Sequence, residues 1–325
     1  MAQIADTKRP RGNAPPERPR VAVLIPCLNE ERMVASVVRD FKRELPDAEI
    51  WVVDNGSADS TPEVARAAGA QIIREPRTGK GFALRLALRD IDADVYVLAD
   101  GDGQLPAESV HELMRPVLEG RADMVVGSRA LAGRTSPRFV NNLGNLLFSK
   151  LLRLLLGVRV TDVLSGYRAL SRVLVRSLPL AARNFEIEVE MTIKTSQRSY
   201  RISEVPYVVR PRPEDSRPHL RVFRDGAVIA WTILLLFRDY RPMAFFGLLG
   251  AASFAMAWLF VGFPGGATQS TEVFSNPPAV LFVMAGMLLL TVGLTVSVLA
   301  RRLGELESKI DMVTTGVVGR RDVEN

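Results

Sequence analysis

The sequence has few of the side chains used for thiol, zinc or histidine chemistry. Cys27 is the only cysteine among the 325 residues, so no intrachain disulfide can form, as is usual for a reducing compartment. The two histidines, His111 and His219, lie far apart along the chain. A zinc site or a histidine-based catalytic triad is therefore poorly supported.

The first 20 residues lack the apolar core of a secretory signal. They are rich in Pro and Arg, which predicts a disordered basic tail over residues 1–20. Such a tail either tethers the chain to a membrane or only adds solubility, and the sequence leaves both open.

Two long segments, 242–263 and 277–300, contain no charged residue. Each is long enough to cross a hydrocarbon core of ~30 Å, and buried core helices are the alternative. Arg238 and Arg241 precede the first segment, and Arg301 and Arg302 follow the second. The connection between the two segments has no Lys or Arg. The positive-inside rule predicts a multi-pass protein of the plasma (inner) membrane with both termini cytoplasmic. Since neither segment holds an ionisable residue, a transporter is disfavoured.

Short β-rich segments alternate with segments of helical periodicity from residue 21 onward. The expected strands cover 21–26, 49–54, 70–74, 94–99 and 123–127, and the expected helices cover 30–45, 61–68, 81–90 and 106–119. This alternation predicts an α/β fold with a doubly wound, mostly parallel sheet. Ligands of such sheets bind at the carboxyl ends of the strands.

The most informative residues follow the expected strand at 94–99. Asp100, Asp102 and Gln104 form an Asp-x-Asp-x-Gln turn there. Two carboxylates and an amide are oxygen ligands suited to a divalent cation on a diphosphate. Two Asp at this spacing also occur in ordinary turns, where they bond their own backbone.

Six motifs follow one another along the chain: Ile25-Pro26-x-x-Asn29-Glu30, Val52-Val53-Asp54-Asn55-Gly56-Ser57, Gly79-Lys80-Gly81, the acidic turn, Gly127-Ser128-Arg129 and Asp162-x-x-Ser165-Gly166-Tyr167-Arg168. In this order and spacing they resemble motifs of the family-2 inverting glycosyltransferases. The last two are similar to motifs of the polyprenyl-phosphate sugar synthases. The resemblance implies a nucleotide-diphospho-sugar transferase fold of the GT-A type. It also implies transfer of a sugar, with inversion, from a nucleotide-diphosphate sugar to polyprenyl phosphate, with Mg²⁺ or Mn²⁺.

Site residues follow from the matched motifs. The resemblance assigns nucleotide-sugar binding to Pro26, Leu28, Asn29, Glu30, Val53, Asp54, Asn55, Lys80, Asp100, Gly101, Asp102 and Arg129. It assigns catalytic roles to Asp100, Asp102, Arg129 and Arg168, and the metal to Asp100, Asp102 and Gln104. Asn55 and Gly101 depart from the Asp and Ala that many relatives have.

Residues 129–172 contain eight basic residues and a single acid, Asp162. We expect cations for the acceptor phosphate among these basic residues. We assign this role to Arg129, Arg134, Arg138 and Arg168, and to Arg217, where relatives carry a phosphate-binding lysine; Arg221 is the alternative to Arg217. A solvated basic face is the other interpretation. Glu186, Glu188 and Glu190 either support the site or are exposed positions of a strand or a helix start.

The expected organisation has five parts. Residues 1–20 are the tail, 21–217 the cytoplasmic glycosyltransferase domain, 218–241 a juxtamembrane interface helix, 242–300 a transmembrane hairpin and 301–325 a cytoplasmic tail. Leucines recur at helical spacing over 139–156, which predicts a helix on the bilayer surface or, alternatively, a core helix.

Two other functions remain open from the sequence. One is a transferase of the same fold that acts on a hydroxyl acceptor, which would need a carboxylate base. The other is a non-catalytic membrane sensor or scaffold that keeps the nucleotide pocket. The expected partners are a nucleotide-diphosphate sugar, a polyprenyl phosphate lipid and the bilayer, without nucleic acid, and an oligomer is left open.

Overall fold

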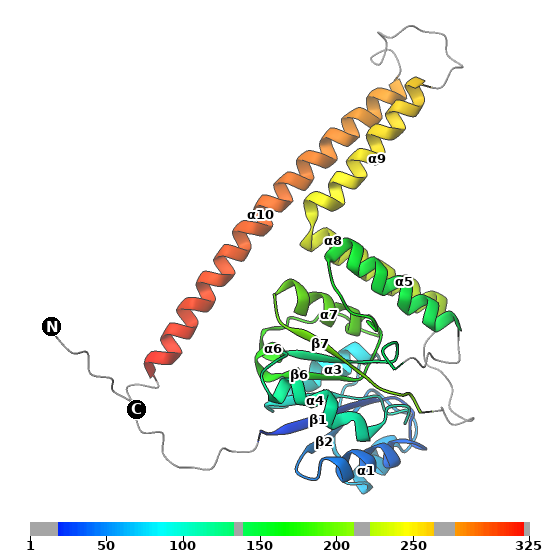
Figure 1. Cartoon of the computed structure of the whole chain (residues 1–325), viewed down its shortest axis with the longest axis vertical. Helices are drawn as coiled ribbons and strands as arrows, with labels where there is room; N and C mark the ends of the chain where they lie inside the picture. The colour runs from blue at the N-terminus through cyan, green and yellow to red at the C-terminus, as the bar shows by residue number, and fades with distance from the viewer. Residues whose placement is uncertain (1–18, 133–138, 211–221, 263–276, 322–325) are drawn as a thin grey trace, which may run out of the picture.

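A seven-stranded sheet with helices on both faces forms the α/β domain, and two long helices extend away from it (Figure 1). This computed structural model describes residues 19–132, 139–210, 222–262 and 277–321. The strands are β1 (Val21–Cys27), β2 (Glu49–Asp54), β3 (Gln71–Arg74), β4 (Val95–Leu98), β5 (Met124–Ser128), β6 (Arg168–Ser171) and β7 (Ile202–Pro206).

The order of the strands is β3-β2-β1-β4-β6-β5-β7. β6 is antiparallel to both of its neighbours, β4 and β5, and the other pairs are parallel. The amino end of β6 therefore lies at the same edge of the sheet as the carboxyl ends of β1, β2, β4 and β5. This places the segment before β6 beside the acidic turn after β4.

The helices of the domain are α1 (Val34–Glu44), α2 (Thr61–Ala67), α3 (Lys80–Asp90), the short η1 (Ala107–Ser109), α4 (Val110–Leu118), α5 (Phe139–Leu156), α6 (Arg172–Ser177), α7 (Ile187–Gln197) and α8 (Val222–Tyr240). Side chains of β4 alternate between two apolar clusters, because successive residues of a strand face opposite sides. One cluster contains residues of α1, α2 and α4. The other contains residues of α3, α5, α7 and α8.

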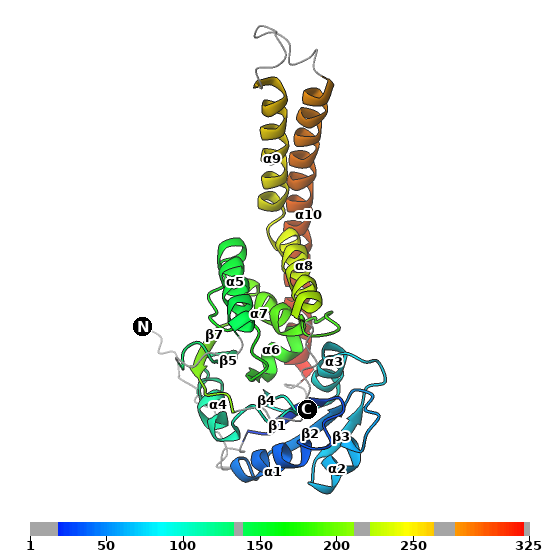
Figure 2. The same ribbon diagram turned by 90° about the vertical axis from the view of Figure 1, so that its right-hand side faces the viewer.

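α5 and α8 carry apolar side chains on two faces, one in the core and one exposed. Leu152 of α5 and Ile233 of α8 lie in the core, which agrees with the core-helix alternative. On the outer faces, however, Leu154 is 81% exposed and Trp231 61% exposed. The two helices pack on each other, and Figure 2 shows them between the sheet and the long helices.

α9 (Pro242–Gly262) and α10 (Pro277–Arg321) pack against each other beyond α8. Glycines allow close approach: a Cβ on Gly286 would lie 2.8 Å from the ring of Phe254. Ser253 donates a hydrogen bond to the Phe282 carbonyl across the pair, at 2.7 Å. Only 11% and 17% of the apolar segments at 242–260 and 277–300 is buried, so they are not core helices, and both are long enough to span a membrane.

The expected α/β fold with a mostly parallel sheet is confirmed, and all five expected strands are present within one or two residues. β6 and β7 were missed. β6 has four residues, begins with an arginine and has no regular alternation, so only its pairing with β4 and β5 reveals it as a strand.

At the opposite edge of the sheet, Asp92 receives hydrogen bonds from Arg176, Arg20 and Arg172. The bonds from Arg176 and Arg20 lower the pKa of Asp92 to about 2. This folded-state pKa lies below the unfolded value of about 4, so the stabilisation is present above pH ~4 and is lost as the pH falls towards 2.

We expect Asp92→Asn to lower the thermal unfolding midpoint of the detergent-solubilised protein at pH 7. The variant should also lose less stability than the wild type between about pH 4 and pH 2. Asp90→Asn, which removes only a contact with the adjacent Arg89, is the matched control. Equal midpoints for wild type and Asp92→Asn at pH 7 would contradict the prediction.

Candidate active site

The acidic turn lies at the carboxyl end of β4. The Asp100 side chain is partly exposed, and its Oδ1 lies 2.5 Å from Lys80 Nζ. Asp102 Oδ1 accepts a hydrogen bond from the Gln104 backbone N–H at 3.1 Å. Gly103 has φ +73°, a left-handed conformation that glycine adopts without strain. The turn therefore presents two carboxylates at the edge where ligands of such sheets bind.

Lys80 begins α3 and joins two acidic groups. Its Nζ lies 2.5 Å from Asp100 Oδ1 and 2.6 Å from Glu188 Oε1. Burial alone would lower the pKa of Lys80, but the charges of Asp100 and Glu188 outweigh it and raise the pKa above its usual value. Lys80 is thus a permanent ammonium beside the acidic turn.

The glycines around Lys80 allow a neighbouring loop to pack closely. A Cβ on Gly79 would lie 2.3 Å from the Arg183 carbonyl oxygen, and a Cβ on Gly81 2.4 Å from that of Ala182. No larger residue fits at either position without moving backbone. The Gly-Lys-Gly motif therefore positions Lys80 through contact with the segment before α7.

The three alternating glutamates are explained by this loop. Glu186 accepts hydrogen bonds from the backbone N–H groups of Arg183 and Asn184. Glu190 accepts from those of Ala181 and Ala182. Glu188 lies between them in sequence and contacts Lys80. All three are buried at the start of α7, which excludes the interpretation of exposed strand positions.

The first two strand ends are joined by side-chain hydrogen bonds. Asn29 has φ +56°, and its Oδ1 accepts from the Ala58 N–H at 2.8 Å. Glu30 N–H donates to Thr61 Oγ1 at 2.8 Å. Asp54 Oδ1 accepts from the Ser57 N–H at 3.1 Å. The predicted nucleotide-binding residues thus come from the carboxyl ends of β1 and β2 and the loop after β1, which are held together at one edge of the sheet: Pro26, Leu28, Asn29, Glu30 and Asp54.

Two members of the predicted nucleotide set have other roles in the structure. Asn55 is buried; its Nδ2 donates to the Arg77 carbonyl at 2.7 Å and its Oδ1 accepts from the Gly79 N–H at 2.5 Å. Its amide therefore holds the loop before Lys80. The Val53 side chain is completely buried in the core, which contradicts a side-chain contact with a nucleotide.

Arg129, at the end of β5, forms a two-point ion pair with Asp162. Nε and Nη2 of Arg129 lie 2.7 and 2.6 Å from the two carboxylate oxygens. Burial alone would lower the pKa of Arg129, but the hydrogen bonds and charge of Asp162 outweigh it. The Arg129 side chain remains 28% exposed, so part of it is accessible beyond this pair.

Arg168 requires a correction. The prediction that it is catalytic and binds the acceptor phosphate is wrong for this structure, because its side chain is 0% exposed. The guanidinium donates to the carbonyls of Ser165 and Val163 and to Thr192 Oγ1. Burial lowers the pKa of Arg168 to about 10, while the nearby charges of Glu188 and Asp162 oppose the shift. Its role is to hold the segment before β6.

The other predicted acceptor ligands, Arg134, Arg138 and Arg217, lie outside the described residues, as does the alternative Arg221. These assignments stay predictions. Besides Arg168, which is buried, Arg129 is the member of the acceptor set whose surroundings the structure describes.

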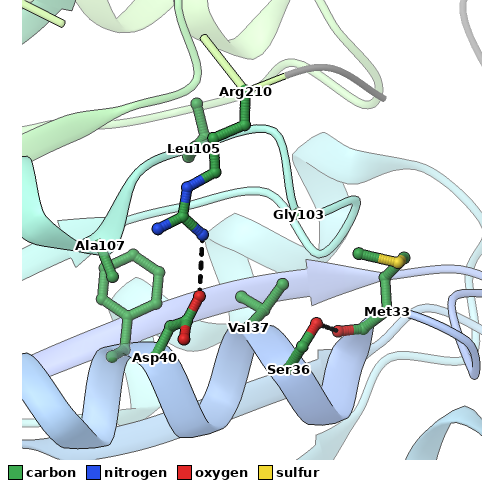
Figure 3. Close-up of a pocket in the computed structure, with 9 residues that line it drawn as sticks. Met33, Ser36, Val37, Asp40, Gly103, Leu105, Ala107 and Arg210 are labelled. Atoms are coloured by element: carbon green, nitrogen blue, oxygen red, sulfur yellow. Dashed lines mark hydrogen bonds and ion pairs between the residues drawn. The ribbon is translucent and has the colours of Figure 1, made fainter. Parts of the chain in front are cut away.

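Sequence reasoning missed Arg210, which supports the acidic turn from the other side. Its backbone N–H donates to the Gln104 carbonyl at 2.9 Å, and its guanidinium contacts Asp40 of α1 and Glu108 of η1. Figure 3 shows the contact between Arg210 and Asp40, which together with Gly103 line a cavity of about 140 Å³. No local pattern could reveal this contact, because Arg210 and Asp40 are 170 residues apart.

The site fits a divalent ion that a nucleotide brings with it. Among the residues that the structure describes, no group of three or more His, Cys, Asp or Glu side chains could hold a metal ion by itself. Mg²⁺ commonly binds one or two carboxylates and completes its shell with phosphate oxygens and water. Asp100 and Asp102 would supply the carboxylates, and the diphosphate the remaining anionic ligands.

Gly101 and Cys27 are complementary beneath the acidic turn. A Cβ on Gly101 would lie 2.4 Å from Cys27 Sγ. Burial raises the pKa of the Cys27 thiol well above its usual value, so it packs as a small neutral group. The thiol thus occupies the space that the alanine of many relatives would need.

We expect Gly101→Ala to destabilise the protein by about 1–3 kcal/mol, the usual range for overpacking, and to disturb the acidic turn. Cys27→Ala in the same chain should restore most of the loss, since the clash is with Sγ. Thermal unfolding of the wild type, both single variants and the double variant measures this coupling. Additive effects of the two substitutions would contradict a direct contact.

We expect Arg168→Met to lower the free energy of unfolding by roughly 3 kcal/mol or more, because it leaves buried charges and carbonyls without their partner. Thermal unfolding and the KM for the acceptor separate this role from ligand binding. A variant of normal stability with a raised KM for the acceptor would instead support the phosphate contact that burial argues against.

Comparison with known proteins identifies the family. The model of Glycosyl transferase family 2 matches residues 22–178. Glycosyltransferase AglJ of Haloferax volcanii is 34% identical over 237 residues, which are 72% of this chain and 78% of that protein. Dolichyl-phosphate hexose transferase of the same organism is 35% identical, over 66% of this chain and 92% of that protein. Undecaprenyl-phosphate mannosyltransferase of Micrococcus luteus is 30% identical, over 58% and 82%.

Solved structures show the same fold. Glucosyl-3-phosphoglycerate synthase from Mycobacterium tuberculosis, in complex with Mn²⁺, UDP-glucose and phosphoglyceric acid, superposes with a TM-score of 0.57 at 29% identity, over 67% of this chain and 80% of that chain. The similarity therefore includes an enzyme that binds a divalent metal and a nucleotide sugar. The chain belongs to glycosyltransferase family 2, with a GT-A-like α/β fold and two C-terminal helices long and apolar enough to span a membrane.

Proposed function

We propose that the protein transfers a sugar from a nucleotide-diphosphate sugar to polyprenyl phosphate at the cytoplasmic face of the plasma membrane, with Mg²⁺ or Mn²⁺ and with inversion. The observation that carries the proposal is the arrangement at one sheet edge, where two carboxylates, Lys80 and Arg129 meet in a domain continued by two apolar helices. The relatives named for dolichyl-phosphate and undecaprenyl-phosphate transfer support the lipid acceptor.

The donor side needs charge stabilisation where the nucleotide leaves. A divalent ion bound by Asp100 and Asp102 would neutralise the departing diphosphate, and such preorganised stabilisation is commonly the largest catalytic term. Lys80 adds a fixed positive charge within 2.5 Å of Asp100. Asn29, Glu30 and Asp54 would bind the nucleoside from the adjacent strand ends.

The acceptor side needs cations more than a base. A phosphate monoester has its second pKa near 6 and is already ionised at neutral pH, so no proton has to be removed from the nucleophile. Arg129 is held in place by Asp162, and the exposed part of its side chain would meet the phosphate. A hydroxyl acceptor requires a carboxylate base to remove its proton. Asp162 and Glu188 are each paired with a cation, so we assign this role to neither.

The outer faces of α5 and α8 would place this edge at the lipid headgroups. Their exposed apolar side chains are Leu146, Leu147, Leu154, Val228, Trp231 and Leu234. A helix with such a face lies in the membrane interface, and aromatic residues favour that depth. Because α8 ends at Tyr240 and α9 begins at Pro242, the interface helix continues directly into the first span. The arginines flanking the hairpin favour a cytoplasmic domain.

We expect the full-length protein in lipid nanodiscs to form a labelled lipid from undecaprenyl phosphate, a divalent metal and one of a panel of labelled UDP- and GDP-sugars. EDTA should abolish the product. Asp102→Asn should lower the rate by at least about a hundredfold, in line with other losses of transition-state charge stabilisation.

Asp92→Asn, at the far edge of the sheet, is the control variant and should keep its activity at a temperature where it is folded. Undecaprenol, which has a hydroxyl in place of the phosphate, tests the acceptor. Comparable transfer to undecaprenol would favour the hydroxyl-acceptor alternative. Nucleotide binding without product across the whole panel would favour the sensor or scaffold.

A further inference from the structure

One oxygen of Glu188 stands out among the buried polar atoms of the described residues. Glu188 is 4% exposed, and its Oε1 contacts Lys80 Nζ at 2.6 Å. Its Oε2 is buried and has no hydrogen-bond partner in the described part of the chain. Leaving a buried charged oxygen unsatisfied is costly, so its presence in a site calls for an explanation.

Among the described residues, Lys80 is the only cation that contacts Glu188, and it also contacts Asp100 of the acidic turn. Lys80 Nζ lies 2.5 Å from Asp100 Oδ1, on the carboxylate that would bind the metal. A Cβ on Gly166 would lie 2.7 Å from Asp100 Oδ2 and 2.9 Å from Lys80 Nζ, so the backbone closes this side of the pair. A divalent ion and the ammonium therefore compete for one carboxylate at close range.

Among the described residues, no other donor is placed to satisfy Oε2 in place of Lys80. Arg168 is close enough to influence Glu188, but its guanidinium is already engaged by Ser165, Val163 and Thr192. Thr192 Oγ1 donates to the main-chain carbonyl of Glu188. The lysine ammonium has three donors on a flexible stem and can turn towards a second oxygen with little movement.

We propose that Glu188 is a positioning residue whose free oxygen receives Lys80 when a divalent ion binds Asp100. In the metal-free state Lys80 bridges Asp100 and Glu188; in the metal-bound state it donates to both oxygens of Glu188 and leaves Asp100 to the ion. Glu188 thereby sets the metal affinity of the acidic turn without contacting the metal. The inference rests on the proposed function in one respect, that Asp100 and Asp102 bind the ion.

Glu190 provides the matched comparison on the same helix. It is equally buried and contacts a lysine, Lys194, at 2.8 Å. Both of its oxygens are used, because they accept hydrogen bonds from the backbone N–H groups of Ala181 and Ala182. Glu190 therefore has no free oxygen to which a lysine could move.

The test measures Mn²⁺ affinity in the presence of saturating UDP, by electron paramagnetic resonance of free Mn²⁺, with full-length protein in nanodiscs. Glu188→Gln keeps the shape of the side chain but removes its charge, which leaves Lys80 to Asp100. We expect Mn²⁺ to bind about tenfold more weakly, since an ammonium in contact with a carboxylate opposes the ion. Asp92→Asn, at the opposite edge of the sheet, should leave Mn²⁺ affinity unchanged.

The double variant Lys80→Met with Glu188→Gln tests whether the Lys80 ammonium is what weakens Mn²⁺ binding. It removes the competing ammonium together with its counter-ion, so Mn²⁺ should bind at least as tightly as to the wild type. This variant also carries the test should Glu188→Gln alone fail to fold. Weak binding by the double variant would overturn the proposal, and so would unchanged Mn²⁺ affinity in Glu188→Gln.

Two further results separate the explanations. If Glu188→Gln binds Mn²⁺ and UDP normally but loses affinity only for the sugar nucleotide, Oε2 serves the sugar, and the proposal is overturned. Asp102→Asn tests the underlying metal site. If Asp102→Asn leaves Mn²⁺ affinity unchanged, the proposed function fails at the metal; if it abolishes binding while Glu188→Gln has no effect, only the present inference fails.

Discussion

The ion pairs of the Lys80 ammonium join three parts of the chain that are far apart in sequence. Asp100 belongs to the turn after β4, Glu188 to α7, and Lys80 itself to the start of α3. The loop before α7 packs on the glycines flanking Lys80, and Glu186 and Glu190 hold that loop through its backbone N–H groups. The geometry of the acidic turn therefore depends on where Lys80 is held.

Charges of opposite sign alternate across this edge of the sheet. Asp100, Lys80 and Glu188 are joined by direct contacts, Asp162 pairs with Arg129, and Arg168 lies close enough to Glu188 and Asp162 to feel both charges. Buried ion pairs contribute little net stability, because desolvation offsets their attraction. Their effect here is geometric: charged groups of the donor and acceptor sides are held in one orientation before any ligand arrives.

α8 connects the core of the domain to the two apolar helices α9 and α10. α8 buries Ile229, Ile233 and Phe237 in the core shared with α3 and α7, while its outer face stays apolar and exposed. Under the proposed function, the inner face packs on protein and the outer face contacts lipid. The position of the active-site edge relative to the bilayer would thus be set by core packing rather than by a flexible linker.

The sequence by itself determined the fold class, five of the seven strands, the two apolar helices and the residues of the acidic turn, because periodicity, turn chemistry and uncharged length are local properties. The reversed strand β6, the Arg210 contacts and the roles of Arg168, Asn55 and Glu188 were decided only by tertiary structure. The sequence of a motif does not show whether its arginine contacts a ligand or is buried against main-chain carbonyls. Only long-range pairing, which brings together residues up to 170 positions apart, settles which partner each charge has.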